Sequence, residues 1–200
     1  GHPTRAAHSK SCPSGRDTLH RDKGYMDFTL FCKIIDELQD VLVSVVLHFQ
    51  GESFLHPELF NMISYARSKN IYTYLSTNGH YLNKENARRI IQSGLNQLVI
   101  SVDGLDQQTY SRYRKKGKLD QVVKGIQQIV EQKKVCKSKL PLVVMQFLVF
   151  RFNEIQLPQV KPFAKKLKVD KLQIKSAQLV SFTKEMLPTI KKYARYRKTK

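Results

Sequence analysis

Three short segments of the sequence combine a glycine with polar side chains that can hold a ligand. They are Gly51-Glu52, Asn78-Gly79 and Asp103-Gly104. Glycine lets the backbone approach a ligand closely, and the carboxylate of Glu52 can accept hydrogen bonds from an ammonium group. Each segment alone also has a structural explanation, because Glu52 could stabilise a helix N-terminus and the other two segments are ordinary turns. Their chemistry becomes informative only if the fold brings them to one edge.

The chain between and around these segments alternates between predicted strands and helices. The first strand is the apolar run at residues 41–49, which contains only Ser44 and His48 as polar positions and is typical of a strand buried on both faces of a parallel sheet. Further strands are predicted at residues 71–76, 97–102, 142–150 and 171–177. Strands that alternate with helices in this way demand parallel pairing with right-handed crossovers. The carboxyl ends of such strands form the edge at which ligands bind.

The predicted helices have recognisable ends. Asp27 and Asn83 are placed to cap two of them, Pro57 suits the first turn of a third, and Gly94 is well placed to end the helix that Asn83 begins. Amphipathic helices are also predicted at residues 119–130 and 157–167. Because neither a Gly-x-Gly-x-x-Gly segment nor a phosphate loop occurs, a dinucleotide fold and a nucleoside triphosphatase are disfavoured. The prediction is an α/β fold, a partial (β/α) barrel of parallel strands with outer helices.

Composition sets wider limits. The chain has 200 residues, of which 41% are hydrophobic, and this suits one domain with a real core. No apolar run approaches the ~20 residues of a membrane span, no secretory signal opens the chain, and three scattered cysteines indicate a reducing, cytoplasmic setting. The net charge of +19 allows a nucleic-acid partner, an acidic protein or an anionic substrate, or simply a basic surface with a charged tail.

Several segments resemble the radical S-adenosylmethionine (radical SAM) enzymes. Residues 51–57, Gly-Glu-Ser-Phe-Leu-His-Pro, are similar to the Gly-Glu-Pro-x-x-His-Pro segment of that family. Residues 76–79 resemble the next strand edge of the family, and residues 101–104 with 109–117 resemble the one after it. Cys12 resembles the last cysteine of the family's Cys-x-x-x-Cys-x-x-Cys loop. The resemblance runs from Cys12 to about Lys200, and it is strongest to a subgroup that carries a C-terminal domain with auxiliary iron–sulfur clusters (SPASM-type).

This resemblance implies two cofactors, S-adenosylmethionine and a [4Fe-4S] cluster, with Cys12 as a cluster ligand. It also implies seven cofactor-binding residues: Gly51, Glu52, Asn78, Ser101, Arg114, Gln146 and Ser176. Glu52 and the Gly51 backbone would hold the methionine ammonium group. Asn78 would contact hydroxyl or carboxylate groups, Ser101 the ribose or carboxylate, and Arg114 the carboxylate. Gln146 and Ser176 would lie on the adenosine side.

The cysteine pattern departs from the family. Counting back from Cys12, the other two cluster cysteines should fall at Ser9 and Arg5, neither of which can replace a thiolate. Cys32 is expected in the core, and Cys136 in a connection at the far end of the sheet. The family's first strand should also precede the cluster loop, so residues 1–11 are expected to be disordered or unrelated sequence, as in an N-terminally truncated or degenerate copy.

The expected function follows from the resemblance. It is reductive cleavage of S-adenosylmethionine to a 5′-deoxyadenosyl radical, impaired here because one cluster cysteine of three is present. The alternatives are a non-catalytic S-adenosylmethionine-binding or protein-interaction remnant, and a basic nucleic-acid-binding module. The substrate would be an unidentified peptide or small molecule. Residues 12–180 would form the partial barrel, lacking its first strand, and residues 181–200 a basic tail leading to a further domain.

Overall fold

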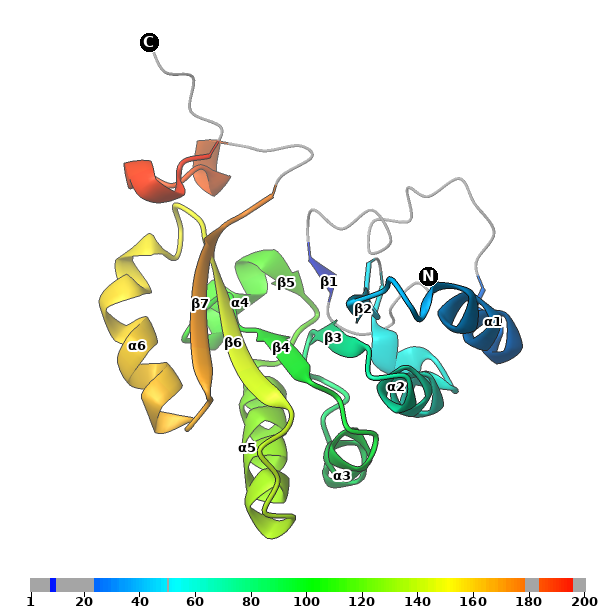
Figure 1. Ribbon diagram of the computed structural model, residues 1–200. Helices are drawn as coiled ribbons and strands as arrows, with labels where there is room; N and C mark the ends of the chain where they lie inside the picture. Colours follow the sequence, from blue (N-terminus) through cyan, green and yellow to red (C-terminus); the bar gives the residue numbers. More distant parts are fainter. Residues whose placement is uncertain (1–7, 10–23, 50, 179–183, 196–200) are drawn as a thin grey trace.

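The computed structural model describes residues 8–9, 24–49, 51–178 and 184–195. Its centre is a twisted sheet of five strands in the order β2-β3-β4-β6-β7 (Figure 1). The strands are β2 (Ser44–Val46), β3 (Tyr72–Thr77), β4 (Gln97–Ser101), β6 (Leu142–Val149) and β7 (Lys171–Ser176). Every pairing in this sheet is parallel, as the alternation of strands and helices predicts.

Six helices are described, and most of them connect the strands along one side of the sheet. They are α1 (Phe28–Leu38), α2 (Leu59–Ser68), α3 (Lys84–Gln92), α4 (Gln107–Tyr113), α5 (Leu119–Val135) and α6 (Leu157–Lys166). Figure 1 shows α2, α3, α5 and α6 following the curve of the sheet on its outer side. The predicted partial (β/α) barrel is therefore confirmed. Among the described residues, no strand pairs with the outer edge of β2, and the sheet begins there.

The helix ends predicted at Asp27, Asn83 and Gly94 are found, whereas Pro57 was wrongly placed in a first helical turn, because α2 begins only at Leu59, after its N-cap residue Glu58. The side chain of Asp27 accepts the backbone N–H of Leu30 at 2.9 Å and begins α1. The side chain of Asn83 accepts the N–H of Asn86 at 2.8 Å and begins α3. Gly94 follows α3 with a φ of 73°, a left-handed conformation that glycine adopts without steric cost. Local capping chemistry is therefore enough to set these boundaries.

The main core lies between the sheet and its helices. Alternate residues of the central strands, among them Leu98, Ile100, Met145 and Phe147, are fully buried against α2, α3, α5 and α6. The intervening residues of the same strands point to the other, concave face. A strand residue that follows this alternation can thus be assigned to the helix side or to the concave side of the sheet.

The strand predicted at residues 41–49 is the clearest correction. Only Ser44–Val46 forms a strand, and Val41, Val43 and Phe49 are 78%, 82% and 89% exposed rather than buried. Leu42, Val45 and Leu47 are the partly buried residues of this run that pack against a core cluster. The physical reason is the position of β2: it pairs with β3 on one side only, so an apolar run that would suit an interior strand lies instead at the edge of the sheet.

Short elements lie near the carboxyl ends of the strands. They are β1 (His8–Ser9), β5 (Arg114–Lys115), and the 3₁₀ turns η1 (Ser53–Leu55), η2 (Glu154–Gln156), η3 (Lys184–Met186) and η4 (Lys191–Tyr193). β1 pairs with β5 in antiparallel fashion, and this brings Ser9 opposite Arg114. Met186 and Leu187 pack against Phe150 and Ala177, so part of the predicted basic tail contacts the barrel end. The division of the chain after residues 11 and 180 stays a prediction.

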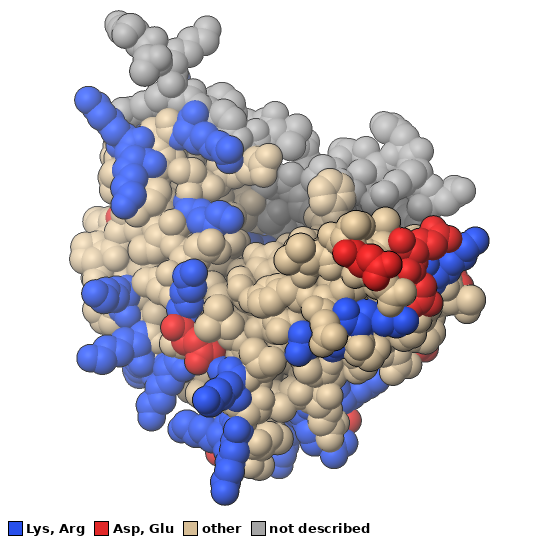
Figure 2. Space-filling model, in the orientation of Figure 1, with Lys and Arg blue, Asp and Glu red and all other residues tan. Residues whose placement is uncertain are grey.

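The surface agrees with the charge of the sequence. Figure 2 shows Lys and Arg side chains spread over the face that carries α5 and α6, and acidic side chains gathered at the end formed by α1. The basic residues on this face do not line up in a single stripe. Among the described helices, none is both long enough and apolar enough to cross a membrane.

Candidate functional site

Glu52 is the most unusual polar residue at the carboxyl-end edge. It lies between β2 and η1, is only 7% exposed, and accepts three hydrogen bonds. The donors are the Thr77 hydroxyl at 2.8 Å, the Asn78 backbone N–H at 2.9 Å and the Phe54 backbone N–H at 3.4 Å. All three donors are neutral, and in the described part of the chain Glu52 forms no ion pair. A buried carboxylate without a counter-ion is a site for a cation.

The pKa of Glu52 is shifted because its buried carboxylate has no directly paired positive charge in the described structure. Burial raises the pKa of the carboxyl group above its ordinary value, and the hydrogen bonds from Asn78, Thr77 and Phe54 oppose this shift in part. The positive charge of Arg114 lowers the pKa of Glu52 further, though it ranks last among these causes. A bound ammonium group next to Glu52 would complete the compensation and favour the ionised form.

The end of β3 supplies the partners of Glu52. The Thr77 hydroxyl donates to Glu52 and accepts the Gly79 N–H at 3.1 Å, so one side chain joins the two segments. Gly79 has a φ of 82°, and a Cβ there would lie 2.9 Å from Cγ1 of Val122. Only glycine fits this turn without displacing the core, and the turn places the Asn78 backbone N–H against Glu52.

Asn78 is itself held by His80, two residues further along the chain. Its Oδ1 accepts the backbone N–H of His80 at 2.9 Å and lies 3.1 Å from Nδ1 of the His80 ring. Because a backbone N–H can only donate, the atom of the Asn78 carboxamide that faces it must be the oxygen, and this fixes the orientation of the amide group. Asn78 is 6% exposed and lies in the same buried polar group as Glu52 and Thr77.

The end of β4 carries a buried ion pair. Nη2 and Nε of Arg114 lie 2.6 Å and 2.7 Å from Oδ2 of Asp103, and Asp103 is completely buried. The other carboxylate oxygen, Oδ1, accepts the Leu148 N–H at 2.9 Å. Burial alone would lower the pKa of Arg114, but the adjacent Asp103 more than offsets it, so that the pKa is raised and the charge secured. The sequence analysis assigned Arg114 to a ligand carboxylate; the structure gives it Asp103 as its partner.

Ser101 and Gln146 lie side by side on adjacent strands. They are register partners on β4 and β6, and Gln146 is in turn the partner of Gln173 on β7. Thr77 pairs with Ile100, so Asn78 and Ser101 are the next residues at adjacent strand ends. Ser176 is different: it pairs with Val149, whose side chain belongs to the helix-side core, and strand alternation therefore turns Ser176 away from the Gln146 side.

Gly51 precedes Glu52 with a φ of 86°, a conformation suited to glycine. Glu52, Asn78, Ser101 and Arg114 thus all lie at the carboxyl-end edge. Sequence reasoning missed two contributors to this group, Thr77 and His80, and named Asp103 without the partner that the structure gives it. Thr77 could have been suspected from its position in a segment that carries the family resemblance, whereas nothing local marks His80.

The expected cluster residue Cys12 lies outside the described residues. Of the other cysteines, Cys32 is half-buried beside the α1 core cluster and Cys136 is exposed at the end of α5. Burial, followed by the charges of Asp36 and Asp27, raises the pKa of the Cys32 thiol. Within the described ranges, no three His, Cys, Asp or Glu side chains are grouped so as to hold a metal ion.

A parallel α/β sheet with a buried polar group at its carboxyl-end edge defines a class of proteins that bind small ligands at strand ends. A family model described as the Radical SAM superfamily matches residues 11–146. The chain therefore belongs to the radical SAM superfamily, as its motifs indicated.

Curated relatives support this assignment. The chain is 25% identical over 140 residues to the Fe-coproporphyrin III synthase of Methanosarcina barkeri, covering 70% of this chain and 33% of that protein. It is 24% identical over 172 residues to the PqqA peptide cyclase of Gluconobacter oxydans, covering 84% and 46%. It is 31% identical over 110 residues to the mycofactocin maturase MftC of Mycobacterium tuberculosis, covering 54% and 28%. These relatives include maturases of the indicated subgroup, and the chain spans about a third to a half of the length of most of them.

Solved structures confirm the fold. Streptococcus suis SuiB bound to the precursor peptide SuiA aligns with a TM-score of 0.67 at 15% identity, over 87% of this chain and 38% of that one. Native anSMEcpe with bound AdoMet aligns with a TM-score of 0.68 at 16% identity, over 93% of this chain and 54% of that one. At these identities the similarity establishes the parallel α/β architecture.

Proposed function

We propose that this chain binds S-adenosylmethionine at the carboxyl-end edge of its sheet. The observation that carries the proposal is Glu52, a buried carboxylate that receives only neutral hydrogen-bond donors in the described structure. S-adenosylmethionine brings both an ammonium and a sulfonium group, either of which would supply the missing positive charge. In the radical SAM family this cofactor is cleaved reductively at a [4Fe-4S] cluster to give a 5′-deoxyadenosyl radical.

The other residues at this edge suit the remaining groups of the cofactor. Ser101 and Gln146 lie next to each other and offer a hydroxyl and a carboxamide to the ribose and adenine. Arg114 is neutralised by Asp103, so we propose that it contributes a fixed donor to the ligand carboxylate rather than a full positive charge. Ser176, on the other side of β7, has no place in this proposal.

The residues of this chain do not fit a [4Fe-4S] cluster. Three thiolates are needed, and the positions that correspond to the family loop hold Arg5, Ser9 and Cys12. The backbone of Ser9 pairs with that of Arg114, so the second of these positions is at the candidate edge. We therefore propose a protein that binds S-adenosylmethionine without holding a cluster through its own thiolates, and whose radical chemistry is impaired.

Calorimetry with S-adenosylmethionine tests this proposal. We expect the wild type to bind and Glu52→Gln to weaken binding at least about tenfold, since the lost charge-assisted interaction contributes about 1.5–3 kcal/mol. Glu85→Gln is the matched control, because Glu85 lies exposed on α3 in an ion pair with Arg88 and should leave affinity unchanged. Wild-type protein that shows no binding heat and no thermal stabilisation by the cofactor would contradict the proposal.

The substrate class is also proposed by similarity. One relative is named for a peptide substrate, PqqA, and SuiB was solved with the precursor peptide SuiA. We propose that the partner of this chain is likewise a peptide. A library of peptides immobilised and probed with the chain, in the presence and absence of S-adenosylmethionine, would test it; binding confined to small molecules would overturn it.

A further inference from the structure

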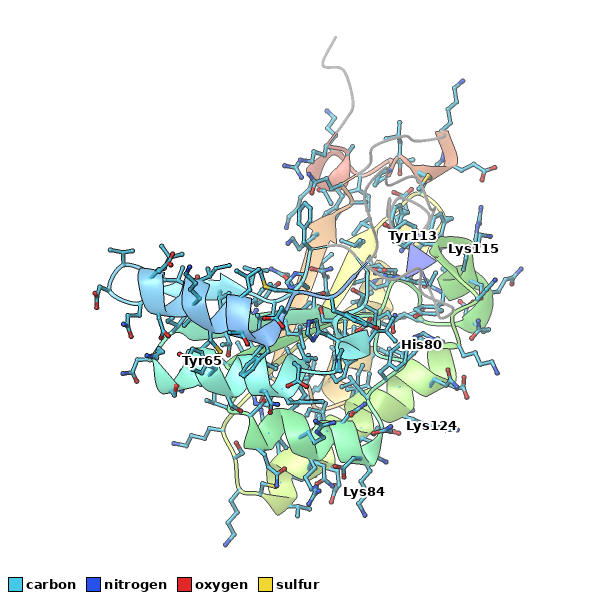
Figure 3. All side chains as sticks on the ribbon, turned by 90° about the vertical axis from the view of Figure 1, so that its right-hand side faces the viewer. Tyr65, His80, Lys84, Tyr113, Lys115 and Lys124 are labelled. Atoms are coloured by element: carbon cyan, nitrogen blue, oxygen red, sulfur yellow. The ribbon has the colours of Figure 1, made fainter. Side chains whose placement is uncertain are left out.

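His80 lies at the junction between the candidate site and the beginning of α5. Nδ1 of its ring is 3.1 Å from Oδ1 and 3.2 Å from the backbone oxygen of Asn78. Nε2 of the same ring accepts the backbone N–H of Lys118 at 2.9 Å. One imidazole therefore bridges the end of β3 and a segment 38 residues further along the chain. Figure 3 labels His80 on the side of the molecule that also carries Lys115 and Lys124.

The beginning of α5 depends on this contact. Helix N-termini leave backbone N–H groups without an intrahelical acceptor, and a capping side chain usually accepts one of them. Lys118, the N-cap residue of α5, makes no side-chain capping bond. Its own N–H donates to His80, and the N–H of Leu119 donates to Oε1 of Gln107 at 2.8 Å. Two side chains from other segments thus replace the local cap.

These contacts assign the tautomer of the ring. Since Nε2 accepts a hydrogen bond from a backbone donor, it must carry the lone pair, and the proton of the neutral ring must be on Nδ1. Nδ1–H then donates to Asn78. Oδ1 of Asn78 receives both this ring donor and the His80 backbone N–H, while the Asn78 backbone N–H donates to Glu52 at 2.9 Å.

We propose that His80, in its neutral Nδ1–H form, is a positioning residue of this site that holds Asn78 in place against the N-terminus of α5. The proposal rests on the function proposed above, because it concerns the geometry that S-adenosylmethionine would meet. Through Asn78 the bridge also fixes the backbone donor of Glu52. His80 touches no cofactor atom in this proposal and acts only through Asn78.

Protonation of the ring breaks the bridge. A second proton on Nε2 would face the N–H of Lys118, donor against donor. Burial lowers the pKa of His80, and the hydrogen bond that the ring donates to the Asn78 backbone oxygen opposes this. Among the nearby charges, Arg114 lowers the pKa of His80 while Asp120 in the first turn of α5 raises it. The bridge is therefore intact at neutral pH and opens on acidification below the ordinary value of 6.5.

The ligand-free protein gives the first test. In ¹⁵N NMR spectra at neutral pH, we expect Nε2 of His80 to be the unprotonated nitrogen. Amide exchange at Lys118 should accelerate about tenfold in His80→Phe, the effect of one neutral hydrogen bond, and much less in His80→Gln, whose carboxamide oxygen can replace the acceptor. His56→Gln is the control, since His56 also makes two ring hydrogen bonds, to Met26 and Glu58, but none to Asn78. A proton on Nε2, or unchanged exchange in His80→Phe, would overturn the proposal.

Calorimetry with S-adenosylmethionine gives the second test. His80→Phe should weaken binding about tenfold and His80→Gln should restore most of the affinity. The affinity of the wild type for S-adenosylmethionine should fall over the same acidic pH range in which NMR shows His80 taking up a proton. In both variants this part of the pH dependence should be absent. Equal affinity losses in the two variants with unchanged pH profiles would mean a purely structural role. If the wild type does not bind at all, the proposed function fails, while the NMR result still decides whether the bridge exists.

Discussion

At the residue scale, Glu52 determines what the site can bind. Its neighbours donate hydrogen bonds but no full charge, whereas Asp103 in the same region is paired directly with Arg114. At this edge the charge of Asp103 is therefore balanced by Arg114, whereas Glu52 has no directly paired positive charge among the described residues. A ligand with a positive group is favoured at Glu52, and an anionic ligand is not, because Arg114 is already neutralised.

The raised pKa of Glu52 predicts a specific pH dependence of stability. Between the ordinary value of 4.5 and the higher pKa of the folded state, the folded chain holds a proton that the unfolded chain has released. Lowering the pH through this window should therefore raise the free energy of unfolding of the wild type relative to Glu52→Gln, by at most about 1.4 kcal/mol per pH unit. Urea denaturation of both proteins from neutral to acidic pH measures the difference. A difference that does not change with pH would contradict the raised pKa.

The Asp103–Arg114 pair predicts a large effect of removing one partner. Asp103→Asn keeps an acceptor for the Leu148 N–H but leaves the Arg114 side chain, only 11% exposed, without its counter-charge. We expect a loss of about 3–5 kcal/mol in the free energy of unfolding, measured by urea denaturation. The double variant Asp103→Leu with Arg114→Met should recover much of this loss.

The exposed pair Glu85–Arg88 provides the control for that comparison. Glu85→Gln should change stability by less than about 0.5 kcal/mol, because exposed ion pairs on a helix contribute little. Equal effects at Asp103 and Glu85 would show that burial does not govern the first pair.

At the scale of elements, the turn after β3 is fitted to α5. A Cβ at Gly79 would lie 2.9 Å from Val122 Cγ1 and 3.1 Å from Ile100 Cγ2, and the residue has a φ of 82°. Gly79→Ala should therefore cost about 2–4 kcal/mol through both backbone strain and overpacking. Gly94→Ala isolates the strain, since its φ is 73° but its nearest neighbour is 3.7 Å away, and it should cost about 1 kcal/mol. Thermal unfolding of the two variants compares them, and a larger loss at Gly94 would refute the packing argument.

Local sequence patterns predicted most helices and strands, but they did not predict how deeply each one is buried or which neighbours it contacts. Asp27 and Asn83 begin helices because a capping side chain acts within three residues of itself. The apolar run at residues 41–49 looked like an interior strand because hydrophobicity alone does not report how many neighbours a strand has. His80 could not be found from the sequence, since its role depends on Lys118, which is adjacent only in the fold.

At the scale of the whole molecule, the outer edge of β2 is an exposed apolar surface. Val41, Val43, Val46 and Phe49 are all more than half exposed, and the described residues provide no strand to cover them. Open apolar edges promote association between chains. We expect the protein to associate with itself at high concentration, and Val43→Lys to reduce this association without changing the fold. Sedimentation velocity over a concentration series measures it. Lys171→Gln on β7, the opposite edge strand, is the control and should not reduce association.

The sequence predicts which residues meet at the candidate site better than it predicts which cofactors the chain holds. Residues at the ends of adjacent parallel strands must meet at one edge, so Glu52, Asn78 and Ser101 were brought together by topology alone. Arg114 also lies at this edge, but its pairing with Asp103 was not anticipated, because the two residues are eleven positions apart and only the fold brings them together. Ser176 was assigned from its nearness to a strand end without regard to strand alternation, and that is why the structure turns it away.

The final prediction concerns the [4Fe-4S] cluster, for which residues 5–12 provide one of the three cysteine ligands. Replacing Arg5 and Ser9 by cysteine would restore the Cys-x-x-x-Cys-x-x-Cys spacing with Cys12, and the pairing of Ser9 with Arg114 puts the second position at the candidate edge. After anaerobic reconstitution with iron and sulfide, the wild type should retain almost no iron, and the double variant Arg5→Cys with Ser9→Cys should retain about four iron atoms per chain. The double variant Ala6→Cys with Lys10→Cys has the same number of thiols at the wrong spacing and should not. The two double variants then differ only in the spacing of their thiolates. A wild type that binds a full cluster would contradict the prediction, and so would a restored motif that binds none. Either result would show that residues other than Arg5 and Ser9 decide whether this fold carries iron.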